Sequence, residues 1–154
     1  MPMNPEVKAA WVAALRGGEY EQGTGHLCQE APRDPSVREF CCLGVLCDLA
    51  AKAGVTTGWI EPRLIPTPPT EYERRSFGVF RERTLGEDEG VEYAALPASV
   101  RNWAGLVDRQ PEVIDPLWNT DPDCGASEWV DIIELNDDRG CSFEELAELI
   151  ERSL

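Results

Sequence analysis

The residues best suited to bind an anion gather in the middle of the chain. Between residues 59 and 83, arginines alternate with aromatic side chains; the set is Arg63, Arg74, Arg75, Arg81 and Arg83 with Trp59, Tyr72, Phe77 and Phe80. A guanidinium fork binds phosphate through paired hydrogen bonds, and an aromatic face stacks on a nucleobase. This pattern predicts a site for a small anionic, nucleotide-type ligand. The alternative is a strand pair with arginine on its solvent face and phenylalanine on its buried face.

A glycine-rich segment near the N-terminus could contribute to the same site. Tyr20, Gln22 and His26 fall on one face of a short strand expected over residues 20–28. Gly23 and Gly25 would let a ligand approach the backbone closely. We therefore predict that these three side chains, together with Arg63, Arg74, Arg75 and Arg81, bind the ligand.

Signals for catalysis and for bound metal are weak. The chain contains no nucleophile-elbow, phosphate-loop or metalloprotease motif, so no catalytic residue and no cofactor is predicted. A hydrolase with a site around His26, Tyr20 and Asp48 remains an alternative. The metal alternatives are a zinc site from His26, Cys28 and Cys41 or Cys42, and a degenerate calcium loop at Glu134, Asn136, Asp138 and Ser142.

Negative charge is concentrated in the last third of the chain. The formal net charge is −15, and residues 108–154 hold 14 of the acids but only 3 of the bases. Binding to nucleic acid phosphates requires clustered lysine and arginine, so we predict no direct nucleic acid binding there. A basic protein partner fits this charge. The apolar runs are too short for a bilayer span and no secretory signal precedes them, so we expect a cytoplasmic protein.

The remaining patterns predict a single α+β domain over residues 1–154, with about five helices around a small antiparallel sheet and an irregular middle at residues 55–95. Helices are expected at Pro5–Arg16, Cys41–Ala53, Leu96–Trp103 and Glu128–Leu135, and after a capping box formed by Ser142 and Glu145. A strand is expected at Val37–Phe40. The predicted core is Trp11, Leu15, Leu43, Leu46, Leu49, Trp103, Val130, Ile133, Leu146 and Ile150.

Three blocks of sequence are familiar in combination. They are residues 19–27 (EYEQGTGHL), residues 40–47 (FCCLGVLC), and residues 134–137 (ELND) followed by residues 142–146 (SFEEL). Together they resemble a widespread group of small, uncharacterised proteins encoded by actinobacterial phages and prophages. The resemblance implies an accessory phage protein acting in a bacterial host.

Two binding functions compete in that setting. The first is sequestration of a small anionic ligand to counter host defence, with a homo-oligomer expected by analogy. The second is inhibition of a basic host protein by an acidic, DNA-mimic-like surface.

Overall fold

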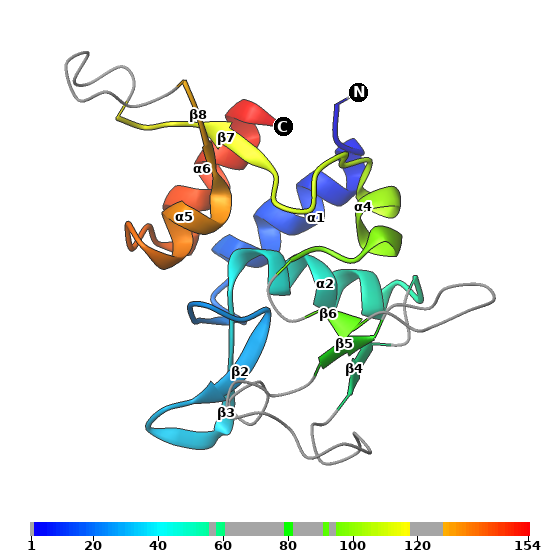
Figure 1. The fold of residues 1–154 in the computed structure, drawn as a ribbon, viewed down its shortest axis with the longest axis vertical. Coiled ribbons are helices and arrows are strands. Elements are labelled where there is room, and N and C mark those ends of the chain that lie inside the picture. The colour runs from blue at the N-terminus through cyan, green and yellow to red at the C-terminus, as the bar shows by residue number, and fades with distance from the viewer. Residues whose placement is uncertain (1, 56–57, 61–78, 82–90, 93–94, 118–127) are drawn as a thin grey trace.

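A computed structural model describes residues 2–55, 58–60, 79–81, 91–92, 95–117 and 128–154 (Figure 1). The predicted Arg63, Arg74, Arg75 and Arg83 and most of the predicted irregular middle lie outside these residues. The fold class is confirmed: five helices and several short strands in the described residues form a small α+β protein.

Helices α1 (Pro5–Arg16) and α2 (Cys42–Lys52) lie in the middle of the molecule (Figure 1). The Asn4 side chain caps α1 by accepting a hydrogen bond from the Glu6 backbone N–H, which satisfies one of the open donors of the first turn. The bounds predicted for α1 are confirmed. α2 is buried around most of its circumference, as its nearly continuous apolar sequence predicts. The Trp11 indole links the two helices by donating to the Cys42 carbonyl over 2.9 Å.

The strands form three small sheets. β1 (Glu21–Gln22) runs parallel to β3 (Asp34–Phe40), which pairs antiparallel with β2 (Cys28–Ala31). β4 (Gly58–Ile60), β5 (Val79–Arg81) and β6 (Val91–Glu92) form an antiparallel sheet within the middle segment. The continuous strand predicted over residues 20–28 is wrong, because the chain bends after Gln22 and Gly25 adopts a φ of 79°. β3 also begins earlier than the predicted Val37.

After the middle segment comes α4 (Ala98–Ala104). The C-terminal third then contributes the strand pair β7 (Glu112–Ile114) and β8 (Trp129–Asp131), α5 (Ile132–Asp137) and α6 (Phe143–Ser153). The helix predicted at Glu128–Leu135 is wrong at its start. Trp129–Asp131 pairs with β7, and the Asp131 side chain then caps α5 by accepting from the Ile133 backbone N–H. The predicted capping box of α6 is confirmed, with Ser142 and Glu145 bonding each other's backbone N–H groups.

The buried side chains form one contiguous cluster between these elements. Leu49, Trp103 and Ile133 pack against it but are only partly buried. Ile132, the residue before Ile133, is fully buried instead, because α5 begins four residues later than predicted. The other predicted core residues are all buried: Trp11, Leu15, Leu43, Leu46, Val130, Leu146 and Ile150.

Candidate functional site

The three sequence blocks meet at one buried polar junction, which centres on Gln22 and Asn136. The Gln22 amide donates to Asn136 Oδ1 over 3.1 Å and to the Cys141 carbonyl over 2.8 Å. Its Oε1 accepts from the Phe143 backbone N–H at the start of α6 over 3.0 Å. Gln22 was predicted to bind a ligand, but these bonds join β1 to the α5–α6 turn.

Asn136 completes the junction from the other side. It is 1% exposed, and its Oδ1 also accepts from the Cys42 backbone N–H at the first turn of α2 over 3.3 Å. Its Nδ2 donates to the Gly23 carbonyl and to Asp137 Oδ1, and Asp137 Oδ2 in turn accepts from the Gly25 backbone N–H. One side chain from α5 thereby holds the bend after β1 and the start of α2. We refer to Gln22, Asn136 and these bonded groups as the polar junction.

Gly44 lies two residues after Cys42 of the polar junction and allows a close contact with the backbone of another segment. A Cβ atom at this position would lie 1.7 Å from the Leu27 carbonyl oxygen, far inside van der Waals contact. The glycine in residues 40–47 therefore allows the segment between β1 and β2 to lie directly against α2. A core contact, rather than a ligand, accounts for this glycine.

Tyr20 lies in a separate cluster with Asp48 and Lys52 of α2. The Tyr20 hydroxyl donates to Asp48 Oδ2 over 2.6 Å and accepts from Lys52 Nζ over 2.9 Å; Lys52 also pairs with Asp48 at 3.1 Å. Burial, and then the hydrogen bond to Asp48, raise the pKa of Tyr20, so the phenol stays protonated at neutral pH. A protonated donor already bonded to a carboxylate is unsuited to act as a general base.

The remaining predicted site residues within the described part of the chain are His26, Asp48 and Arg81. His26 is partly buried in the bend between β1 and β2, and Arg81 ends β5. Asp48, which was named in the alternative hydrolase site, has a side chain that is 16% exposed and is bonded to Tyr20 and Lys52. The nucleotide-type site stays a prediction, because its other arginines lie outside the described residues.

The described cysteines are thiols, four of them buried: Cys28, Cys41, Cys42 and Cys47. Burial in apolar surroundings raises the pKa of Cys28 and of Cys41 to about 12, which suppresses the reactive thiolate. Within the described part of the chain, no three His, Cys, Asp or Glu side chains gather where they could hold a metal ion.

The C-terminal third carries an exposed acidic surface, and one of its arginines, Arg139, is bonded within the protein. Arg139 binds both oxygens of the buried Asp115 at 3.0 and 3.1 Å and Glu134 at 2.7 Å. Exposed acids for which the described ion pairs include no cation are Asp108, Glu112, Glu128, Asp138, Glu145 and Glu148.

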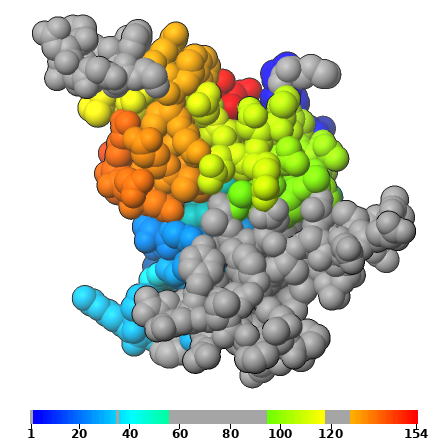
Figure 2. All heavy atoms as spheres, viewed as in Figure 1, coloured from blue at the N-terminus to red at the C-terminus, as the bar shows by residue number. Residues whose placement is uncertain are grey.

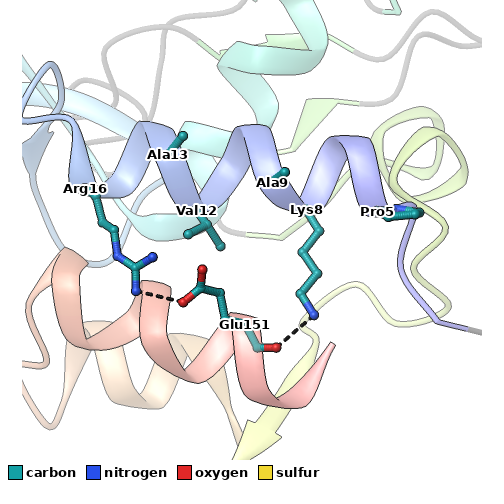
Figure 3. Close-up of a pocket in the computed structure, with 7 residues that line it drawn as sticks. All are labelled: Pro5, Lys8, Ala9, Val12, Ala13, Arg16 and Glu151. Atoms are coloured by element: carbon teal, nitrogen blue, oxygen red, sulfur yellow. Dashed lines mark hydrogen bonds and ion pairs between the residues drawn. The ribbon is translucent and has the colours of Figure 1, made fainter.

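A groove of about 560 Å³ runs between α1 and α6 (Figure 3). Val12 and Ala13 line it, and Lys8 and Arg16 reach across it to Glu151 on α6. Lys8 Nζ donates to the Glu151 backbone carbonyl over 3.0 Å, and Arg16 pairs with the Glu151 carboxylate at 2.8 Å. Both cations are thus already bonded to α6. These residues carried no signal in the sequence beyond the amphipathic pattern of α1.

A second hollow, of about 270 Å³, lies where the chain after α4 meets β7 and β8. We call it the Val107–Trp129 hollow. Figure 2 shows these segments, residues 96–117 and 128–140, side by side on one face. Val107 is 74% exposed and Trp129 42% exposed, and Asp108 and Glu112 contribute carboxylates to the lining. No sequence pattern indicated this hollow, because segments far apart in the chain line it: residues 2–3, 105–108, 111–112, 129 and 153–154.

The helices within the described residues fall short of the length and hydropathy that a bilayer span requires. No curated protein and no solved structure matches the chain. A family model does match, over residues 3–154, and its description is a domain of unknown function, DUF8296. Because this match covers nearly the whole chain, the protein belongs to the DUF8296 family.

Proposed function

We propose that this protein is a non-catalytic binding protein that docks onto a basic partner protein through its C-terminal third. The observation that carries the proposal is the distribution of ion pairs. Arg139 is bonded to Asp115 and Glu134, while exposed acids of the same third of the chain, among them Glu112 and Glu148, take part in none of the described ion pairs. Complementary charge of this kind speeds encounter and selects a partner of opposite sign.

The polar side chains elsewhere support a binding role over a catalytic one. Gln22, Asn136 and Tyr20 make internal hydrogen bonds, and the buried thiols have raised pKa values. The resemblance to phage and prophage proteins makes a host protein the expected partner. Inhibition of that host protein in the bacterial cytoplasm is the expected consequence.

Salt-dependent capture from a bacterial lysate tests the proposal. Tagged protein should retain a basic host protein at about 50 mM salt and release it near 0.5 M, because salt screens exposed charges beyond a few ångströms. A variant with Glu128→Gln, Asp138→Asn and Glu148→Gln should lose that protein.

A matched variant with Glu6→Gln, Glu21→Gln and Glu30→Gln controls for net charge. These three acids are also exposed but lie in the N-terminal part of the chain. Equal losses from both variants, or retention that salt does not alter, would contradict docking through the C-terminal third.

Sequestration of a small anionic ligand is the second candidate. The groove between α1 and α6 favours it, because Lys8 and Arg16 lie beside an apolar floor there; a ligand phosphate would have to replace their bonds to Glu151. Native mass spectrometry of the purified protein, followed by denaturation, should then release a nucleotide-sized mass and report any homo-oligomer. An Arg16→Gln variant should retain less of that ligand if the groove holds it. A bare protein would remove this candidate.

A further inference from the structure

The Val107–Trp129 hollow combines exposed apolar surface with acidic charge. Among the described residues, only three large apolar side chains are strongly exposed, and two of them, Val107 and Trp129, line this hollow. Exposed apolar surface bordered by charge is typical of a protein–protein contact, where a central side chain is buried and a polar rim surrounds it.

The chain around Val107 is held in place before any partner arrives. The Val107 carbonyl accepts from Arg101 Nη1 over 2.9 Å, and the Leu106 backbone N–H donates to the Arg101 carbonyl over 2.9 Å. The Arg109 carbonyl accepts from the Leu96 N–H over 3.0 Å. Since these bonds already fix the backbone, binding would lose little conformational entropy.

Glu112, which lines the hollow, lies close to a second carboxylate outside it. Glu112 on β7 lies directly opposite Asp131 on β8, and like charges in register destabilise a strand pair. Burial raises the pKa of Asp131, and Glu112 is the largest charged contribution in the same direction. A cation brought by a partner would relieve this repulsion.

We infer that the Val107–Trp129 hollow is the point at which a partner protein docks, an inference that rests on the proposed function. Its occupant is a segment that inserts one apolar side chain between Val107 and Trp129 and sets lysine or arginine beside Asp108 and Glu112. The volume of about 270 Å³ accommodates a single large side chain with part of its backbone. The residues that line the hollow account for both contacts. Val107 and Trp129 bury the apolar side chain of the partner, and Asp108 and Glu112 bind the cations on either side of it.

Titration with two short synthetic peptides of glycine and lysine tests the inference. One peptide has a central leucine and the other a central serine. Burial of the leucine should make its peptide bind about tenfold more tightly. NMR shift changes should concentrate in residues 106–112 and 129–131 and at the Trp129 indole.

Two variants localise the effect. Val107→Ser should weaken the leucine peptide about fivefold and leave the serine peptide unchanged, because one apolar contact is lost. Leu117→Ser is the matched control: Leu117 is 46% exposed and does not line the hollow, so binding should not change.

Three outcomes overturn the inference. They are equal binding of the two peptides, shift changes confined to α6, or no binding of the leucine peptide. The proposed function fails by a different observation, the absence of salt-dependent capture in the lysate experiment. A protein that captures a basic partner but does not distinguish the peptides would keep its function and lose this docking site.

Discussion

The polar junction and the acidic surface of the C-terminal third use polar side chains in opposite ways. At the junction, both the carbonyl and the amide of Asn136 are bonded, and the side chain is 1% exposed. At the surface, Glu112 and Asp131 lie opposite each other and repel. A satisfied buried network stabilises and specifies a fold, whereas uncompensated surface charge is commonly kept for recognition. The junction therefore serves folding, and the acidic surface is where we propose that a partner binds.

The largest expected effect is at Gly44. Gly44→Ala should destabilise the protein by more than about 3 kcal/mol, or prevent folding, because its Cβ would overlap the Leu27 carbonyl. Urea denaturation followed by tryptophan fluorescence measures the change. In Gly18→Ala, the control, φ is 70° and the added Cβ meets open space, so the loss should be about 1 kcal/mol. Equal losses would remove the close approach of the two segments as a determinant of the fold.

Asn136→Ala should have the next largest effect. The substitution leaves the Cys42 N–H and the Gly23 carbonyl without this partner inside the protein, at about 2–4 kcal/mol in total. Asp138→Ala, at an exposed position two residues later, should change the free energy of unfolding by less than about 0.5 kcal/mol. If the two variants were equally stable, the junction would no longer differ from the surface.

Arg139 lies in the acidic C-terminal third but is bonded to a buried carboxylate, so it combines features of the polar junction and of the surface. Arg139→Gln should destabilise the protein by about 2–3 kcal/mol, since it leaves the 1% exposed Asp115 carboxylate without its cation. Adding Asp115→Asn should recover part of this loss, because the buried charge is then gone. Thermal and urea unfolding of both single variants and the double variant measure the coupling. Simple additivity would mean that the pair does not stabilise the fold as a unit.

The smallest effect, of opposite sign, is expected at Asp131. Burial and Glu112 raise its pKa above the ordinary 3.8, so the folded protein holds this proton more tightly than the unfolded chain does. Ionisation therefore weakens folding as pH rises from 3.8 through the folded pKa. Asp131→Asn should raise Tm slightly at pH 7, since asparagine caps helices equally well. This gain should shrink as pH falls towards 3.8, and a loss of stability at pH 7 would contradict net repulsion.

Local patterns predicted the helices well because their signals are contained in adjacent residues. Asn4 with Pro5 marked the start of α1, and Ser142 with Glu145 marked the capping box of α6. β8 was mistaken for the first turn of a helix. Trp129–Asp131 becomes a strand because β7, far away in the chain, pairs with it, and no local propensity records that partner.

The candidate sites could be predicted less well, because they depend on which segments meet. Tyr20 and Gln22 were expected on one face of a single strand, but Tyr20 lies in a bend before β1 and the two side chains have different partners. Gln22 joins Asn136, and Tyr20 joins Asp48. No sequence motif marks the residues that line the groove between α1 and α6 or the Val107–Trp129 hollow.

By itself, the sequence determined the α+β class, the amphipathic and capped helices, most of the core and the acidic C-terminal third. Each of these follows from composition or from spacing along a few turns of chain. Only the tertiary structure decided that Asn136 bonds groups both at the bend after β1 and at the start of α2, and that Val107 and Trp129 share a hollow. The reason is physical: hydrogen-bond satisfaction and exposure depend on partners distant in sequence, which folding alone brings together.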